Sequence, residues 1–460
     1  MKTMSTVFDA IVIGTGQSGP SLAVRLAAAG KRVAIVERNR IGGTCVNNGC
    51  IPTKTLIASA RAAWVARNAG EFGVRIDGNI TIDMKAVKAR KDRLVAQSSQ
   101  SVEKWLRGTH GLSVIHGHAR FTSPHTVSVG DETLTAAHIF VNVGGRPVVP
   151  NVPGLAELPY LTSSTMMNVD FLPAHLVIVG GSYIGLEFAQ MYRRFGSRVT
   201  LLESGPQLIS RDDADIAQSI HDILTGEGID IRTNVGAMKR AARDQDGIAV
   251  EMSDGTLVNG SHLLVAVGRR PNTDDLGLDR AGIVTDKRGY IQVDDELRTN
   301  IDGIWAIGDC NGHGAFTHTS YNDYEIVAAN ILDDDERRLS DRILTYGLFV
   351  DPPLGRCGMT EREARASGKK VLVARMNMTR VGRARERSET QGFMKVLVDA
   401  ESKLILGAAI LGIGGDEVVH ALLDVMYARA PYTVVQRAMH IHPTVAEFLP
   451  TVLGTLKPLA

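Results

Sequence analysis

Residues 8–19, FDAIVIGTGQSG, run an apolar segment directly into a glycine turn spaced Gly14-x-Gly16-x-x-Gly19, and a helix-compatible run of small residues follows. In a strand–turn–helix unit of this kind, the first glycine allows the tight turn and the second lets the backbone approach a pyrophosphate. The third brings the helix against the strand, and the free N–H groups of the helix face the phosphates. The next apolar segment ends at Glu37, where a carboxylate can bind a ribose hydroxyl. The stretch therefore predicts an α/β dinucleotide-binding fold.

The same pattern recurs at 175–203, where an apolar segment meets Gly180-x-Ser182-x-x-Gly185 and the following one ends at Glu203. The interval from the first glycine to the acid is the same in both copies. A serine replaces the middle glycine here, and its hydroxyl could donate to a phosphate. Two different dinucleotides on one chain predict electron transfer between them.

Length and composition limit the class of protein. At about 150 residues per domain, 460 residues predict roughly three domains. A formal net charge of +1 gives no general attraction to nucleic acid or to anionic membranes, and no apolar run approaches the roughly 18 residues that span a bilayer. The N-terminal residues do not resemble a signal peptide. Four cysteines do not make a disulfide framework, so we expect a cytoplasmic protein, where a disulfide is more often catalytic than structural.

Two of the cysteines lie in residues 42–54, GGTCVNNGCIPTK. Cys45 and Cys50 are too few for a structural zinc site, which takes four ligands. Buried core thiols and a working disulfide both remain open from the residues alone. Pro52 suits the first turn of a helix, which would place Cys50 near a helix N-terminus, where the dipole favours a thiolate.

Other turns point to the connections between domains. Residues 142–154 and 265–278 each follow an apolar strand with a glycine turn and prolines, and we interpret both as crossings between domains. Residues 299–312, TNIDGIWAIGDCNG, place Asp309 at the end of a buried strand. Its carboxylate could bind a polyol such as the ribityl chain of a flavin, or could cap a helix.

With these motifs in this order, nearly the whole chain resembles the pyridine nucleotide–disulfide oxidoreductases, which include glutathione reductase, dihydrolipoamide dehydrogenase and mercuric reductase. The resemblance implies an α/β fold with two Rossmann-like dinucleotide-binding domains and an α+β C-terminal dimerisation domain. The implied divisions are an FAD-binding domain at 1–148 and 271–340, an NAD(P)H-binding domain at 149–270, and an interface domain at 341–460.

The resemblance also implies the cofactors, with FAD on the first glycine turn and NAD(P)H on the second. The implied cofactor-binding positions are Gly14, Gly16, Gly19, Glu37, Gly43, Thr44, Lys54, Ala119, Gly144, Gly180, Gly185, Glu203, Gly268 and Asp309. Because the Glu203 carboxylate would accept hydrogen bonds from a free ribose 2′-hydroxyl and repel a 2′-phosphate, we expect NADH to be preferred. Arg211 and nearby arginines leave NADPH possible.

For the redox centre, the resemblance implies a disulfide between Cys45 and Cys50 beside the flavin. Cys50 would face the flavin and Cys45 would exchange with substrate. Lys54 would lie near the flavin, paired with Glu187. Tyr183 would cover the flavin until a nicotinamide displaces it.

The C-terminal residues 440–450, HIHPTVAEFLP, supply an acid–base candidate. His442 precedes a proline and is followed by Glu447, and the resemblance implies that this glutamate orients the imidazole. The pair would reach the active site of the other subunit, which implies a homodimer with shared active sites. Ordinary histidines at a helix start, or a metal pair of His440 and His442, are the alternatives; we expect no metal site.

Some features depart from the family pattern or carry no assigned role. Asn48 stands where the family usually has an aliphatic residue, and we interpret Cys310 and Cys357 as inert core thiols. The arginine-rich residues 375–389 are interpreted as a solvated strand edge, with a surface for an anionic substrate or a partner as the alternative. Residues 84–106 are predicted as one extended helix, and the chain from about 341 as an antiparallel sheet with covering helices.

Within the family, the acceptor decides the function. A mercuric reductase needs a vicinal cysteine pair near its C-terminus, and this sequence ends LKPLA. We therefore favour the mercuric-reductase-like group that lacks this pair, reducing a small-molecule disulfide or a metal ion. Dihydrolipoamide dehydrogenase is the alternative, and an NADH oxidase or an NAD(H)-binding sensor is the second alternative. We expect no nucleic acid or membrane partner.

Overall fold

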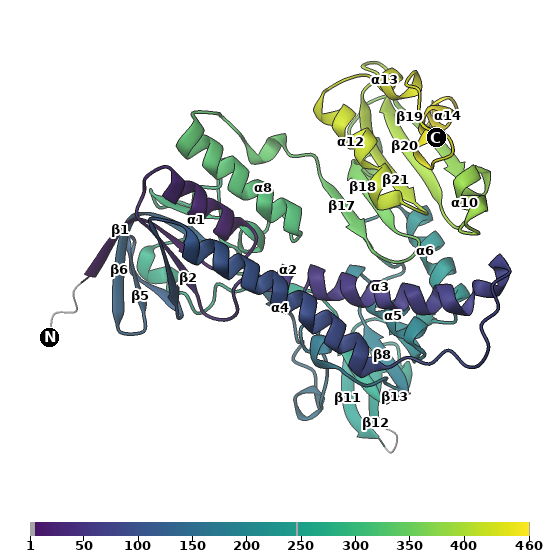
Figure 1. The fold of residues 1–460 in the computed structure, drawn as a ribbon, viewed down its shortest axis with the longest axis horizontal. Coiled ribbons are helices and arrows are strands. Elements are labelled where there is room, and N and C mark those ends of the chain that lie inside the picture. The colour runs from purple at the N-terminus through teal and green to yellow at the C-terminus, as the bar shows by residue number, and fades with distance from the viewer. Residues whose placement is uncertain (1–4, 245–246, 460) are drawn as a thin grey trace.

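The computed structural model describes residues 5–244 and 247–459, which form three regions, each built on a sheet (Figure 1). The first region is a sheet with strand order β3-β2-β1-β6-β5-β4, and β16 pairs with β6. Its strands are β1 (Ser5–Ile13), β2 (Val33–Glu37), β3 (Leu112–His116), β4 (Ala119–Ser123), β5 (Thr126–Val129), β6 (Glu132–Val141) and β16 (Ile304–Ala306). Its helices are α1 (Ser18–Ala28), α2 (Gly43–Asn47), α3 (Cys50–Arg67), α4 (Met84–Gly108), α7 (Leu278–Ala281) and α8 (Thr317–Ala328).

The second region repeats the parallel core of the first. Its order β10-β9-β8-β14 matches β3-β2-β1-β6, and every neighbouring pair in both sets is parallel. The strands are β8 (His175–Val179), β9 (Arg198–Leu202), β10 (Asp230–Arg232) and β14 (His262–Val265), with helices α5 (Tyr183–Phe195) and α6 (Ala214–Gly226). A three-stranded antiparallel sheet of β11 (Met238–Asp244), β12 (Gly247–Met252) and β13 (Leu257–Gly260) lies beside them.

The two connections between these regions run side by side. Strand β7 (Gly145–Pro147) leaves the first region and β15 (Arg269–Pro271) returns to it, and the two pair antiparallel. Just beyond this ladder the Val148 N–H donates to the Gly268 carbonyl at 2.9 Å. The two segments interpreted as crossings from the sequence therefore meet as a two-stranded ribbon.

The third region is an antiparallel sheet of order β17-β18-β21-β20-β19-β22 with helices around it. Its strands are β17 (Thr345–Leu348), β18 (Leu354–Gly358), β19 (Val371–Asn377), β20 (Phe393–Asp399), β21 (Ile405–Leu411) and β22 (Lys457–Pro458). Its helices are α9 (Glu361–Ala366), α10 (Gly382–Glu386), α11 (Gly415–Val418), α12 (His420–Tyr427), α13 (Thr433–Gln436) and α14 (Leu449–Leu453).

One apolar core links the three regions. Leu56 of α3, Phe188 of α5 and Phe393 of β20 belong to the same buried cluster, and Figure 1 shows α3 between the second and third regions. Each such side chain stabilises the fold by about 1.5–3 kcal/mol when fully buried. Because α3 begins at Cys50, this packing fixes the cysteine loop where all three regions approach one another.

The fold class predicted from the sequence is confirmed, and so are the extended helix and the C-terminal antiparallel sheet. The interpretation of residues 375–389 as a strand edge is only partly right. The strand β19 ends at Asn377, and the arginines that follow lie in a short 3-10 helix (Met378–Arg380) and in α10. In the described part of the chain, no helix is both long and apolar enough to cross a bilayer.

Candidate active site

The two cysteines of the loop lie in adjacent helices. Cys45 is in α2, and Cys50 is the first residue of α3, as predicted. Both are free thiols and they hydrogen-bond each other. Gly49 between the helices carries no side chain because a Cβ there would lie 2.8 Å from the Thr44 carbonyl oxygen. The turn therefore closes tightly enough to keep the two sulfurs together.

The surroundings make Cys50 the acidic member of the pair. The hydrogen bond from the Cys45 thiol, the one with Thr317 Oγ1 (3.0 Å) and the charge of Lys54 lower the pKa of Cys50 to about 6, against the effect of burial. The same hydrogen bond and burial raise the pKa of Cys45. The first proton to leave the pair therefore leaves from Cys50.

Lys54 lies one turn further along α3. Its ammonium donates to both carboxylate oxygens of Glu187, at 2.9 and 2.8 Å, and Glu187 also accepts from the Phe349 N–H at 3.2 Å. The Glu187 side chain is only 8% exposed. The predicted pair is therefore present, and it joins the cysteine helix to α5.

The first glycine turn is closed on two sides. A Cβ on Gly14 would lie 2.3 Å from the Asn142 carbonyl oxygen, and one on Gly19 would lie 2.3 Å from the Gly14 oxygen. The Asn142 amide donates to the Gly14 and Gly16 carbonyls at 3.2 and 3.1 Å. A Cβ on Gly43, at the start of the cysteine loop, would lie 2.7 Å from Gly16 Cα. This bare backbone, at a helix N-terminus, is a cradle that fits a pyrophosphate.

The acids after the two turns make the same contacts. Glu37 Oε2 accepts from the Thr15 N–H at 3.0 Å, and Glu203 Oε2 accepts from the Gly181 N–H at 2.6 Å. In each case the other oxygen accepts, at 2.8 Å, from the N–H two residues further on, at Asn39 or Gly205. The repeat seen in the sequence therefore extends to single hydrogen bonds.

The remaining predicted cofactor positions are spread over the first region, the second region and the connections between them. Burial raises the pKa of Asp309, whose Oδ2 lies 4.0 Å from Arg269 Nε. A half-buried carboxylate with this setting fits a polyol that can donate to it. Gly144 and Gly268 have φ of +62° and +138° with open space where a side chain would be. Thr44 lies in α2, Ala119 is buried in β4, and Gly185 is buried in α5, against the Gly180 oxygen. The residues present fit FAD on the first turn.

Tyr183 has a partner that the sequence did not indicate. Its hydroxyl donates to Asp212 Oδ2 at 2.9 Å, and the Tyr346 hydroxyl donates to Asp212 Oδ1 at 3.0 Å. Burial raises the pKa of Asp212, and the nearby Arg356 guanidinium opposes that rise. Asp212 lies in the run RDDAD, which reads as an ordinary acidic helix start, so only the fold identifies its role.

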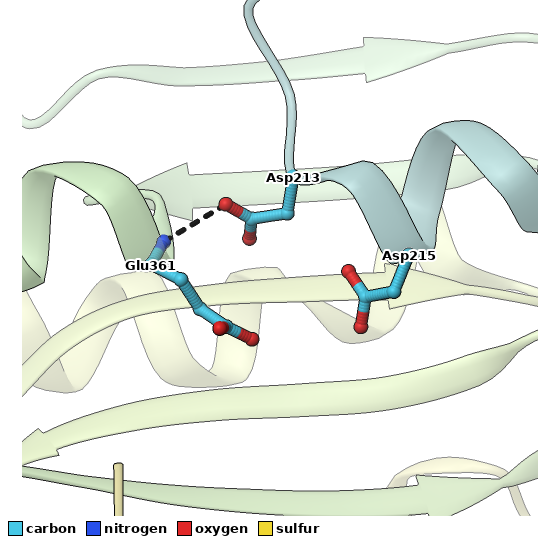
Figure 2. A group of neighbouring side chains, drawn as sticks. All are labelled: Asp213, Asp215 and Glu361. Carbon is cyan, nitrogen blue, oxygen red and sulfur yellow. Dashed lines mark hydrogen bonds between the residues drawn. The ribbon is translucent and has the colours of Figure 1, made fainter. Parts of the chain in front are cut away.

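Three further carboxylates, on Asp213, Asp215 and Glu361, point toward one another (Figure 2). Lys395 Nζ lies 2.8, 2.7 and 2.9 Å from their oxygens. The lysine ammonium therefore occupies the place that a metal ion would take and offsets part of the negative charge of this group.

The C-terminal acid–base pair is formed within the chain but is separate from the cysteines. His442 Nδ1 lies 2.8 Å from Glu447 Oε2, and the Glu447 side chain is largely buried. The His442 side chain is 81% exposed, and the peptide before Pro443 is cis. Figure 1 shows α13 and α14, which flank the pair, far from α2. No hydrogen bond between described residues joins this pair to Cys45 or Cys50.

The other two cysteines are buried thiols, as interpreted from the sequence. Burial raises the pKa of both Cys310 and Cys357 to about 12. Asn48, between Cys45 and Cys50, donates to Ser164 Oγ at 3.2 Å, so its amide ties the loop to the segment before β8.

Comparison with known proteins covers almost the entire chain. Residues 8–323 match the family model described as pyridine nucleotide-disulphide oxidoreductase, and 345–453 match the dimerisation domain of that family. The probable pyridine nucleotide-disulfide oxidoreductase RclA of Escherichia coli is 36% identical, over 98% of this chain and 99% of its own length. Mercuric reductase of Streptomyces lividans is 35% identical over 98% and 96%. Dihydrolipoyl dehydrogenase of Geobacillus stearothermophilus is 33% identical over 95% and 94%.

A solved structure of one of these relatives has a similar fold. The Cu(II) complex of the HOCl-induced flavoprotein disulfide reductase RclA of E. coli has a TM-score of 0.89 and 36% identity. The match covers 97% of this chain and 99% of that one.

Proposed function

This chain belongs to the pyridine nucleotide-disulphide oxidoreductase family, whose members are FAD-dependent and use NAD(P)H, and from that premise we propose its acceptor and its working residues. The proposed activity is the NAD(P)H-dependent reduction of a small-molecule disulfide or a metal ion by the Cys45–Cys50 pair. FAD, when bound, would take two electrons from the coenzyme and deliver them to this pair. The glycine turn, Glu37 and Asp309 would hold it.

The observation that carries this proposal is the difference in acidity between the two cysteine thiols. The Cys50 thiol is acidic and is held by Thr317, whereas the Cys45 thiol keeps its proton and donates to Cys50. A buried core pair would need neither the acidity nor the Lys54–Glu187 ion pair beside it. Perturbed acidity at a helix N-terminus is typical of working thiols.

With a disulfide acceptor, the steps balance as two thiol–disulfide exchanges. The Cys45 sulfur, after losing its proton, attacks the acceptor, so that a mixed disulfide forms and the first acceptor thiolate leaves. The Cys50 thiolate then attacks the Cys45 sulfur, which releases the second acceptor thiolate and re-forms the Cys45–Cys50 disulfide. Overall, one NAD(P)H and one proton reduce one disulfide to two thiols.

These exchanges need a base for Cys45 and an acid for the leaving thiolates. His442, oriented by Glu447, is the candidate. Since the pair is exposed and remote from the cysteines of its own chain, we propose that it serves the site of a second copy. Met439 and Ile441 beside it are 99% and 80% exposed, which favours their burial against a partner. The predicted homodimer would therefore have shared active sites.

A metal ion is the other acceptor class that we propose. Two electrons would reduce one Hg(II) ion, or two Cu(II) ions to Cu(I). The similarity to a mercuric reductase and to a reductase solved as a Cu(II) complex supports testing both metals. Two adjacent thiolates are soft ligands that suit these ions.

Dihydrolipoamide dehydrogenase is the second candidate. The His442–Glu447 pair favours it, because thiol–disulfide exchange requires proton transfer and metal-ion reduction at two thiolates does not. The exchange steps would then run in reverse and a dithiol would be oxidised.

An acceptor panel separates the candidates. Steady-state turnover of the flavin-loaded protein would be measured with lipoamide, glutathione disulfide, Cu(II), Hg(II), quinones and oxygen, each with NADH and NADPH. We expect turnover with a disulfide or a metal ion that Cys45→Ser abolishes. Turnover with oxygen alone, unchanged by Cys45→Ser, would contradict the proposal.

His442→Ala tests the role of the acid–base pair. Removing one general base typically slows a reaction by about 10²–10⁴, so disulfide turnover should fall by that order. A metal-ion turnover that survives this substitution would identify the metal as the acceptor. Mixing inactive Cys45→Ser and His442→Ala chains should restore activity, because each mixed dimer has one intact site. Folded, flavin-loaded mixed dimers that stay inactive would contradict the shared site.

A further inference from the structure

Tyr183 lies between the second glycine turn and the cysteine pair. It is the first residue of α5, directly after the turn, and its ring packs edge-on against Phe316 with centroids 6.1 Å apart. The next residue, Thr317, hydrogen-bonds Cys50. On the proposed function, a coenzyme held by the second turn would pass this ring on its way to the cysteine side of the molecule.

We propose that Asp212 is a positioning residue that holds Tyr183 across this passage, and that it sets how readily the coenzyme enters. The inference rests on the proposed function, in which NAD(P)H must pass Tyr183. Asp212 bridges the hydroxyls of Tyr183 and Tyr346, one on each carboxylate oxygen, at 2.9 and 3.0 Å. Its side chain is fully buried, so water does not compete for these bonds.

The loop that delivers Asp212 also touches the glycine turn. The Ile209 N–H donates to the Gly181 carbonyl at 3.0 Å, and the Asp212 N–H donates to the Ile209 carbonyl at 2.8 Å. Ile209 has φ of +39°, which is unusual for a β-branched residue and persists only where surrounding contacts impose it. A ligand that shifts Gly181 is therefore felt at Asp212 through two hydrogen bonds.

The far side of Asp212 is anchored in the C-terminal sheet. Arg356 of β18 lies 3.4 Å from Asp212 Oδ1 and 3.6 Å from Asp213 Oδ2. Asp213 in turn accepts from the Glu361 N–H at 2.9 Å (Figure 2) and pairs with Lys395 of β20. Asp212, which holds Tyr183, is therefore itself held by the C-terminal sheet. This is the region that we expect to contact a second copy.

The Tyr183 side chain would have a closed position, bonded to Asp212, and an open one, and the balance between them would affect coenzyme binding. Tyr183 must leave Asp212 for the passage to open, so the hydrogen bond stabilises the closed position. A ligand that binds only the open position has its apparent affinity reduced by the fraction of molecules that are closed. Weakening the bond should therefore increase apparent coenzyme affinity without altering the contacts of the coenzyme itself.

A double-mutant cycle on the flavin-loaded protein tests this. The variants are Tyr183→Phe, which keeps the ring and removes its hydroxyl, Asp212→Asn, which removes the charge that strengthens the bond, and the double variant. Asp215→Asn is the matched control, since Asp215 pairs with Lys395 but is not bonded to Tyr183. The probe is a tetrahydronicotinamide analogue of NADH, which cannot be oxidised, and its binding is measured by calorimetry.

We expect Tyr183→Phe to bind the analogue about threefold to tenfold more tightly, the range given by losing one hydrogen bond to a charged group in a partly closed population. Asp212→Asn should shift affinity in the same direction, and the double variant should match Tyr183→Phe. The control should bind as the wild type does. Additive effects, or equal shifts in Asp212→Asn and Asp215→Asn, would overturn the inference.

Failure of this inference can be distinguished from failure of the proposed function. A wild-type flavin that neither NADH nor NADPH reduces would contradict the proposed function, whereas the binding cycle still decides the role of Asp212. Should Asp212→Asn fail to fold, Tyr183→Phe decides alone, and unchanged affinity in that variant would refute the inference.

Discussion

The two glycine turns share strand order, spacing and the hydrogen bonds of their acids, but they differ in how they are enclosed. At the first turn, the Asn142 amide binds two carbonyls and Gly43 of the cysteine loop packs on Gly16. At the second, the position that matches Asn142 is Ala266, and Ser182 is exposed where the first turn has Gly16. From this difference we expect the first turn to retain its cofactor and the second to release one.

The largest effect should come from the first glycine of each turn. A Cβ would lie 2.3 Å from the Asn142 oxygen in Gly14→Ala and 2.4 Å from the Ala266 oxygen in Gly180→Ala, and both positions have φ above +100°. Because backbone must shift in each case, we expect Gly14→Ala to purify without flavin. Gly180→Ala should stay yellow and fail to be reduced by NADH. Absorption spectra before and after NADH addition measure both, and loss of flavin from both variants would remove the distinction.

The cysteine loop on the first turn gives the next largest effect. Since the pKa of Cys50 is lowered to about 6, its thiolate is present above that pH and declines about tenfold per unit below it. The two-electron-reduced protein should therefore show a long-wavelength thiolate–flavin absorption that fades as pH falls through about 6. Cys50→Ser should abolish the band at every pH, whereas Cys45→Ser should retain it. Identical spectra for the two variants would show that the roles are wrongly assigned.

The preference between NADH and NADPH tests whether Glu203 is held for a ribose hydroxyl in the same way as Glu37. Glu203 is bound to backbone N–H groups as Glu37 is, so its carboxylate stays where a ribose 2′-hydroxyl would donate and a 2′-phosphate would be repelled. We expect kcat/KM for NADH to exceed that for NADPH by about tenfold, equivalent to about 1.4 kcal/mol. A tenfold preference for NADPH would reverse this assignment and point to Arg211.

A graded change in flavin retention, rather than complete loss, is expected at the Asn142 clamp. Asn142→Ala removes two hydrogen bonds to the first turn and copies the residue found at the second. At about 1 kcal/mol net per bond, flavin should dissociate roughly five- to thirtyfold faster, while NADH binding stays unchanged. Flavin release would be followed by fluorescence after dilution, and a rate equal to that of the wild type would show that Asn142 does not retain the cofactor.

Local patterns in the sequence account for most of the fold and for half of the site. The strand–turn–helix units, their acids and the helix that begins at Cys50 are short-range features, so periodicity and glycine spacing predict them. The contacts of Thr317, Asp212 and Asn142 join positions more than a hundred residues apart in most cases, and no local pattern marks them. The composition of the arginine-rich segment favours a strand edge, whereas its short helices bury Met378, Val381 and Ala384 in the core of the C-terminal region.

The antiparallel ribbon of β7 and β15 makes the second region a module with adjoining ends. Chain exit and return are joined by the β7–β15 ladder and, just beyond it, by the hydrogen bond between Val148 and Gly268, so the intervening residues could be excised and the gap closed by a very short link. The first sheet would keep all its strands, including β16, which enters after the return. The architecture is therefore suited to exchange of whole coenzyme modules between relatives, a form of recombination in which the incoming module must restore the contacts with α3 and with the C-terminal sheet.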